Sequence, residues 1–286
     1  MIKCIASDMD GTLLNSREKI STENKKAIEL AQSKGVEVVI ATGRSYMEAR
    51  HALEGVELAC SVISLNGAVV WDKEGKIIAS NPIEVEDYKK ARNVLDGIGV
   101  YYEIYTSHGT YTHCMEQSVD TLVDILVTAM PHVNPLYIAE RVRMRFETDM
   151  AKVIADYDDL YEIPGIEFYK ILVYSLDNNL LGKAGGELKH QTKLAVSSSG
   201  QGNLEITSKF AQKGNALALL VAECNIALND TMAIGDNYND VSMLEKVGKP
   251  VAMGNAPEEI KQLCGEVTLT NDENGVAKAI LKATNE

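Results

Sequence analysis

Residues 4–14 read CIASDMDGTLL: small and apolar residues lead to two aspartates, Asp8 and Asp10, and then to Gly11. Residues i and i+2 of an extended segment point the same way and lie roughly 6–7 Å apart, so both carboxylates can face one ligand. Gly11 allows the chain to leave the strand sharply. The stretch predicts a buried strand that carries two carboxylates at its carboxyl end. The alternative is a simple Asp-Gly turn in which Asp8 only caps a neighbouring segment.

Strand-like and helix-like segments alternate on either side of these aspartates. Ser21 is a plausible N-cap for the first helix, and Gly35 stands where that helix should stop. Short apolar strands joined by helices indicate a parallel sheet covered on both faces. Asp8, Thr42 and Asn66 then lie at the carboxyl ends of strands, where such sheets bind ligands. The expected strands are 2–8, 36–44 and 61–68, and the expected helices are 21–35 and 46–53.

The middle of the chain has shorter and more polar strands between helical stretches. It predicts an α+β domain with an antiparallel sheet, residues 83–207, inserted into a parallel domain of residues 1–82 and 208–286. In ERVRMRFETDM (140–150), charges alternate with apolar residues, which favours a strand with one solvated face. The parallel domain resumes with a helix over 213–226 and a buried strand over 231–236.

Composition excludes several classes of protein. No stretch approaches the roughly 18 apolar residues that span a bilayer, and no secretory signal opens the chain, so we expect a cytoplasmic protein. The 28 basic and 41 acidic residues give a net charge of -13, which argues against nucleic-acid binding. The five cysteines form no CxxC pair, so we expect buried, reduced thiols rather than disulfides or a zinc site.

Four separated motifs need a common explanation: DMDGT (8–12), TGR (42–44), Lys213 before a glycine, and GDNYND (235–240). In this order they resemble the haloacid dehalogenase-like phosphohydrolases, and within them the Cof-type branch with a C2-type cap. NGA after the third strand and LEIT five residues before Lys213 match as well. The resemblance covers essentially the whole chain. It implies an α/β fold, a Rossmann-like parallel-sheet core with an inserted α+β cap domain.

The resemblance also assigns roles to the acidic residues. It makes Asp8 the nucleophile that forms an aspartyl-phosphate and Asp10 the general acid and base. An anionic nucleophile that attacks a phosphate needs a hard divalent cation, and Mg²⁺ is the natural candidate. Asp8, Asp10 and Asp236 are the expected metal ligands. Asp240 is expected to hold the metal's waters or Lys213, although a role as N-cap alone stays open.

The remaining motif residues are expected to bind the phosphate. The hydroxyl of Thr42 and the backbone N–H groups of Thr42 and Gly43 can cradle phosphate oxygens, and Arg44 adds a guanidinium fork. In isolation TGR is more often a turn followed by a solvated arginine. Lys213, near the start of its helix, is expected to neutralise the nucleophile and the transferring group. Gly11 and Asn239 complete the expected phosphate-binding residues.

The inserted domain is expected to select the substrate, because the core motifs suit any phosphoryl group. The candidates for contact with a sugar hydroxyl or second phosphate there are His108, His113, Arg141, Arg143, Arg145 and Lys170, although such residues are more often solvated or structural. The leading hypothesis is a Mg²⁺-dependent phosphatase for sugar phosphates or phosphorylated cofactors. We expect a monomer or small homo-oligomer whose partner is a small phosphorylated metabolite, without nucleic acid or membrane.

Three alternatives to this hypothesis differ in class. A phosphotransferase or mutase on the same core and a catalytically silent sensor of phosphorylated metabolites both stay open. A receiver-type signalling module is disfavoured, because its phosphorylated aspartate should end a later strand and no large domain should interrupt its chain. The intact pair Asp8 and Asp10 argues against the silent sensor.

Overall fold

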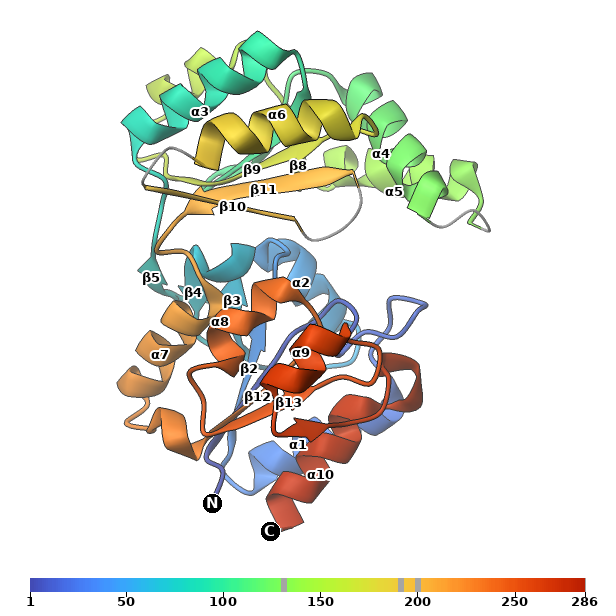
Figure 1. Ribbon diagram of the computed structural model, residues 1–286, viewed down its shortest axis with the longest axis vertical. Helices are drawn as coiled ribbons and strands as arrows, with labels where there is room; N and C mark the ends of the chain where they lie inside the picture. The colour runs from blue at the N-terminus through green and yellow to red at the C-terminus, as the bar shows by residue number, and fades with distance from the viewer. Residues whose placement is uncertain (130–132, 190–192, 199–201, 286) are drawn as a thin grey trace. The chain divides into compact units, whose positions relative to one another are not determined.

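The computed structural model describes residues 1–129, 133–189, 193–198 and 202–285 (Figure 1). The chain divides into two compact units, one formed by Met1–Asn81 and Phe210–Glu286, the other by Pro82–Lys209. Among the described residues, no helix combines the length and the hydropathy needed to cross a bilayer.

The first unit contains an eight-stranded sheet in the order β14-β13-β12-β1-β2-β3-β4-β5. The six strands from β14 to β3 run parallel, and β4 and β5 add an antiparallel edge. The parallel sheet predicted for this region is therefore confirmed. Its strands are β1 (Cys4–Ser7), β2 (Glu37–Ala41), β3 (Ser61–Ser64), β4 (Val69–Trp71), β5 (Ile77–Ser80), β12 (Thr231–Gly235), β13 (Lys249–Ala252) and β14 (Glu266–Val267).

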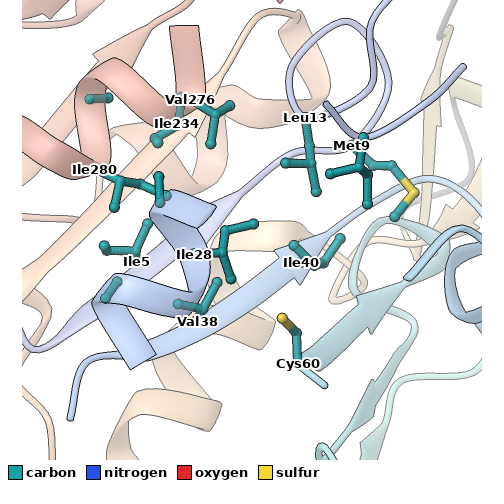
Figure 2. Packing of buried hydrophobic residues seen from close by; sticks show 14 of the residues in the cluster. Ile5, Met9, Leu13, Ile28, Val38, Ile40, Cys60, Ile234, Val276 and Ile280 are labelled. Carbon is teal, nitrogen blue, oxygen red and sulfur yellow. The ribbon is translucent and has the colours of Figure 1, made fainter. Parts of the chain in front are cut away.

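Helices cover both faces of this sheet. Successive side chains of a buried strand point to opposite faces, so one strand contributes to two apolar clusters. Ile5 of β1 packs in one apolar cluster, and its neighbours Cys4 and Ala6 pack in another. The first cluster includes residues of α1 (Thr22–Ser33), α2 (Tyr46–Glu54) and α10 (Gly275–Asn285). Figure 2 shows part of it, with Ile5 near Ile28 and Ile280. The second includes residues of α7 (Lys213–Glu223), α8 (Val241–Leu244) and α9 (Glu258–Leu263).

Short 3₁₀ helices connect several of these elements: η1 (Leu65–Gly67), η3 (Leu228–Asp230), η4 (Tyr238–Asp240) and η5 (Asn271–Glu273). The start of α1 follows the sequence prediction, since the hydroxyl of Ser21 accepts a hydrogen bond from the Asn24 N–H at 3.1 Å. Gly35 follows this helix with a φ of 78°, a conformation that favours glycine.

The second unit is an α+β domain built on a six-stranded sheet in the order β10-β11-β9-β6-β7-β8. All its strand pairs are antiparallel except β7 with β8. Its strands are β6 (Tyr101–Thr106), β7 (Gly109–Thr112), β8 (Ala151–Val153), β9 (Phe168–Tyr174), β10 (Leu194–Ser197) and β11 (Asn203–Ser208). Its helices are α3 (Val85–Ile98), α4 (Met115–Ala129), α5 (Pro135–Glu147), α6 (Asn178–Lys189) and the 3₁₀ helix η2 (Tyr157–Glu162).

The strand predicted over ERVRMRFETDM is wrong, because most of this stretch belongs to helix α5. Asn134 caps the helix and Pro135 occupies its first turn, which are helix-start signals just upstream of the quoted residues. Ile138, Ala139 and Val142 are buried at helical spacing, whereas Met144 is 55% exposed. The apolar residues that alternate with the charges therefore do not share one face.

The prediction that the cysteines are buried, reduced thiols holds only in part. All five are free, and Cys4 and Cys60 are buried. Cys224 is exposed at the end of α7, and Cys114 and Cys264 are half-buried. The expectation that every thiol is buried is therefore wrong for three of them.

Two substitutions in α1 test the packing of this helix on the sheet. Ile28→Ala removes a fully buried side chain from the cluster around β1, and we expect it to lower the free energy of unfolding by about 2–5 kcal/mol. Leu30→Ala, two residues further on, removes a side chain that is already 36% exposed, and we expect a change of about 0.5 kcal/mol or less. Urea unfolding measures both. Equal losses would show that α1 does not pack as described.

Candidate active site

Four loops meet at the carboxyl edge of the parallel sheet, because neighbouring parallel strands end on the same side. Asp8 follows β1, and its N–H still donates to the Ile234 carbonyl of β12 at 2.9 Å. Thr42 follows β2, the η1 segment follows β3, and Asp236 follows β12. The sheet order β12-β1-β2-β3 makes these loops neighbours.

A buried lysine joins two of the aspartates. Lys213 is the first residue of α7, and its Nζ donates to Oδ1 of Asp8 at 2.5 Å and to Oδ1 of Asp240 at 2.7 Å. Lys213 and Asp240 are 0% exposed, and Asp8 is 4% exposed. Because burying an unpaired charge is costly, each of these three charges depends on the others.

Asp236 adds a third carboxylate to this group. Oxygen atoms of Asp8, Asp236 and Asp240 lie within 4.8 Å of one another. The hydroxyl of Thr12 donates to Oδ1 of Asp236 at 2.7 Å. Three carboxylates against one ammonium leave two negative charges, which a divalent cation with oxygen ligands would balance. The donor set therefore fits a hard divalent cation, the class to which the expected Mg²⁺ belongs.

Burial and the neighbouring charges shift the pKa values of the residues in this cluster. Burial, reinforced by the charge of Asp240, raises the pKa of Asp8 well above its ordinary value, against the opposing effect of Lys213. Burial also raises the pKa of Asp236 to about 6. For Lys213, burial acts to lower the pKa, but the charges of Asp240 and Asp8 outweigh it and raise the pKa. The lysine therefore keeps its positive charge.

Besides binding Lys213, the carboxylate of Asp240 accepts hydrogen bonds from backbone N–H groups. Its Oδ2 accepts hydrogen bonds from the N–H groups of Asp236 at 2.9 Å and Asn237 at 3.0 Å. Both of its oxygens are thus engaged by protein groups, and the carboxylate fixes the loop that carries Asp236. Asp240 directly precedes α8 but makes no side-chain capping hydrogen bond to that helix, so its interpretation as an N-cap is wrong. Its side chain instead closes the capping box of η4 that begins at Asn237, and it binds Lys213.

Asp10 lies apart from the three-carboxylate cluster and pairs with Arg44. Nε of Arg44 is 2.9 Å from Oδ2 of Asp10, and Nη2 is 2.6 Å from Oδ1. The side chain of Asp10 is 54% exposed, so this two-point pair stands near solvent. The spacing of Asp8 and Asp10 does not bring both carboxylates into one cluster in this structure.

Gly11 turns the chain directly after Asp10. Its φ is 77°, and a Cβ at this position would lie 2.5 Å from Oδ2 of Asp236. The Nδ2 of Asn255 donates to the Gly11 carbonyl at 2.8 Å and holds the turn. Asn255 was not predicted to belong to the site, because it lies far along the chain in a loop without a motif.

The TGR segment corrects one expectation. The N–H of Thr42 donates to the Ile63 carbonyl at 2.8 Å as part of the sheet, so the predicted contribution of this N–H to a phosphate cradle is wrong. The Thr42 hydroxyl oxygen accepts from the Arg44 N–H at 3.1 Å. Gly43 lies against Asn66, where a Cβ would be 3.3 Å from the amide oxygen Oδ1.

Asn239 also faces Asn66. Its Nδ2 donates to Oδ1 of Asn66 at 3.2 Å, which joins the loop after β12 to the segment after β3. From the sequence, Asn66 was expected at a strand end and as the first residue of the NGA match, without a role in the site. The amide pair gives it a part in the site.

Two of the basic side chains proposed for substrate contact in the second unit form ion pairs within that unit. Arg145 makes a two-point pair with the fully buried Glu103, with Nη2 2.7 Å from Oε2. Nζ of Lys170 lies 3.3 Å from Oε1 of Glu205. His113 packs against the ring of Tyr157, with centroids 3.7 Å apart.

Comparison with known proteins identifies the family. A model of the haloacid dehalogenase-like hydrolases matches residues 5–280, so the chain belongs to this family, in its Cof-type branch. Its enzyme class is phosphoric monoester hydrolase. The resemblance described from the four motifs is therefore confirmed.

Two relatives from Bacillus subtilis align over nearly the full length. Phosphatase YwpJ is 38% identical over 281 residues, 96% of this chain and 98% of the relative. The 5-amino-6-(5-phospho-D-ribitylamino)uracil phosphatase YwtE is 36% identical over 277 residues, 96% of each chain. A solved haloacid dehalogenase-like hydrolase from B. subtilis, 38% identical, superposes with a TM-score of 0.85 and covers 98% of this chain and 99% of that one.

Gly11→Ala tests whether the turn after Asp10 shapes the cation site. We expect this variant to displace Asp236 and to weaken the stabilisation by Mg²⁺, measured as the rise in melting temperature on adding the metal. Gly35→Ala is the matched control, since Gly35 has a φ of 78° but open space around its Cβ position. Both should lose about 1–2 kcal/mol of stability to backbone strain. A normal Mg²⁺ effect in Gly11→Ala would contradict this account.

The raised pKa values predict how Mg²⁺ stabilisation depends on pH. Carboxyls whose pKa rises on folding stabilise the metal-free protein below the unfolded value near 4, and this stabilisation is lost as the pH rises through about 6. A divalent cation binds carboxylates in their ionised form. We therefore expect Mg²⁺ to raise the melting temperature more at about pH 7.5 than at about pH 5.

Two variants serve as controls for this pH dependence. Asp236→Asn should abolish the Mg²⁺ effect, whereas Asp230→Asn, which removes only a surface ion pair with Lys3, should keep it. The same Mg²⁺ shift at both pH values would show that these carboxylates do not hold the metal.

Proposed function

We propose that this chain is a Mg²⁺-dependent phosphatase that hydrolyses small phosphorylated metabolites, sugar phosphates or phosphorylated cofactors, through an aspartyl-phosphate on Asp8. The observation that carries the proposal is the buried ammonium of Lys213, 2.5 Å from Oδ1 of Asp8, at the carboxyl edge of the sheet. A lysine in this place suits an anionic nucleophile that attacks an anionic group.

In the proposed first step, Oδ2 of Asp8 attacks phosphorus and the bond from phosphorus to the leaving oxygen breaks. Lys213 holds Oδ1 and so fixes the orientation of the carboxylate. The ammonium also offsets the charge of the attacking group, while Asp240 holds the ammonium in place from its other side at 2.7 Å.

Asp10 is proposed to protonate the leaving oxygen and then to activate the water that hydrolyses the aspartyl-phosphate. Its carboxylate is bound by Arg44 in this structure. We expect substrate binding to exchange this pair, so that Arg44 turns to the phosphate or to the polar body of the substrate. The exposure of Asp10, 54%, leaves it room to move.

Asp8 and Asp236 are the residues that would hold Mg²⁺, with Asp10 as a third ligand proposed from the family pattern and Asp240 in support. When bound, the metal would supply charge neutralisation between the nucleophile and the phosphate. The phosphate oxygens would contact the Thr42 hydroxyl, the backbone of Gly11 and Gly43, and the side chains of Arg44 and Asn239.

The substrate class draws support from the relatives. YwtE is named for a phosphoribityl compound, which is a phosphorylated polyol chain on a small ring. For this chain we propose the broader class of small phosphorylated metabolites, selected by the second unit. A cytoplasmic location and a monomeric or small homo-oligomeric state stay predictions from the sequence.

Turnover of an aryl phosphate tests the proposed roles of the aspartates. We expect Mg²⁺-dependent phosphate release from p-nitrophenyl phosphate, stopped by EDTA and restored by Mg²⁺. Asp8→Asn should abolish release, because an amide of the same volume is a poor nucleophile. Asp10→Asn should slow it by about 10²- to 10⁴-fold, the usual contribution of a general acid or base.

The outcomes separate the alternatives. Retained activity in Asp8→Asn would remove the aspartyl-phosphate from the mechanism, and indifference to EDTA would remove the metal. No release by the wild-type protein would favour a phosphotransferase that needs a second substrate, or a sensor that binds phosphorylated metabolites without turnover.

A further inference from the structure

The three residues after β3 have an unusual backbone. Leu65, Asn66 and Gly67 all have positive φ, at 51°, 58° and 101°. Asparagine and glycine adopt this conformation readily, but it is strained for leucine. Such backbone persists where the surroundings fix it, and it is often found at functional sites.

Hydrogen bonds from two sides fix this segment. The N–H of Leu65 donates to the Arg44 carbonyl and the N–H of Asn66 to the Thr42 carbonyl, both at 2.9 Å. On its other side, Nδ2 of Asn81 donates to the Gly67 carbonyl at 3.3 Å. A Cβ on Gly67 would lie 2.5 Å from the Gln212 carbonyl oxygen, so the segment also packs tightly against the residue before Lys213.

The bond to Thr42 also sets the direction of a neighbouring N–H group. In a planar trans peptide the C=O and the following N–H point in opposite directions. Because the Thr42 carbonyl points to Asn66, the Gly43 N–H points away from Asn66. β2 lies between β3 and β1 in the sheet, so this N–H points to the side of β1, the strand that Asp8 follows.

The side chain of Asn66 reaches the loop after β12, which carries Asn239. It is 7% exposed, and its Oδ1 accepts from Nδ2 of Asn239 at 3.2 Å. An amide presents donors at its nitrogen and an acceptor at its oxygen. Since Asn66 offers an oxygen, Asn239 has to turn its nitrogen towards it, and this decides the direction of the whole Asn239 amide.

We propose that Asn66 is a positioning residue for phosphate binding, which acts by fixing the orientation of the Asn239 amide. The inference rests on the proposed function, in which Asn239 contacts the phosphate. Asn66 itself need not touch the substrate. Its left-handed backbone, held by the Thr42 carbonyl, keeps the side chain directed at Asn239.

Asn66→Gly separates this role from the fold of the segment. Glycine keeps the positive φ and the N–H that bonds to Thr42, and only the side chain is lost. We expect the dissociation constant of inorganic phosphate, titrated in the presence of Mg²⁺, to rise roughly 10- to 100-fold, as is usual for partners that orient a binding group. The melting temperature should stay close to that of the wild type.

Asn225→Gly is the matched control. Asn225 also has a positive φ, 55°, but it is exposed and follows the C-terminal end of α7, whereas Lys213 begins that helix. The same substitution there should leave phosphate binding unchanged.

A double-mutant cycle with Asn239→Ala tests the route of action. If Asn66 acts through Asn239, adding Asn66→Gly to Asn239→Ala should weaken phosphate binding by less than about 2-fold further. Losses that multiply would overturn the proposal, because they would show that Asn66 acts independently. Wild-type phosphate affinity in Asn66→Gly would also overturn it.

Turnover of p-nitrophenyl phosphate by the wild-type protein, measured in parallel, tests the proposed function separately. Phosphate binding without turnover would contradict the phosphatase mechanism and leave the binding cycle to decide the role of Asn66. A wild-type protein that does not bind phosphate would overturn the role of Asn66, and one that also fails to turn over p-nitrophenyl phosphate would overturn the proposed function as well.

Discussion

The buried ion pairs of Lys213 are the constraint on which the rest of the site depends. A fully buried ammonium at the start of α7 is tolerated because Asp8 and Asp240 face it from two different strand ends. Each partner in turn fixes a loop: Asp8 extends β1, and Asp240 accepts hydrogen bonds from the backbone N–H groups of Asp236 and Asn237. The excess negative charge of these carboxylates then favours the binding of a cation.

Much of this arrangement could be predicted from the sequence, because it follows from strand ends. The apolar runs before Asp8, Thr42 and Asp236 indicate buried parallel strands, and such strands bring their following residues to one edge. The family resemblance added the order of the motifs. The turn at Gly11 could be predicted from the sequence. The close approach of the Asp236 oxygen, which leaves no room for a Cβ on Gly11, could not.

The features that the sequence did not predict depend on side-chain direction and tertiary packing. The spacing of Asp8 and Asp10 in the sequence allows both carboxylates to face one ligand, but it gives no sign that Arg44 binds Asp10. The N–H of Thr42 was assigned to phosphate because sheet pairing with Ile63 was not visible in the sequence. Helix α5 was read as a strand because charges alternate with apolar residues over a few positions, whereas burial follows Ile138, Ala139 and Val142.

The topology of the first unit has a consequence for the order of its assembly during synthesis. Strand β1 pairs with β12, whose residues 231–235 are made more than two hundred residues later. One edge of β1 therefore stays without its native neighbour while residues 82–209 emerge from the ribosome, and this second unit has an apolar core of its own. Asp8 meets Lys213 and Asp240 only after residues 213 and 240 have been made, so the nascent chain carries an incomplete site while the whole second unit is synthesised.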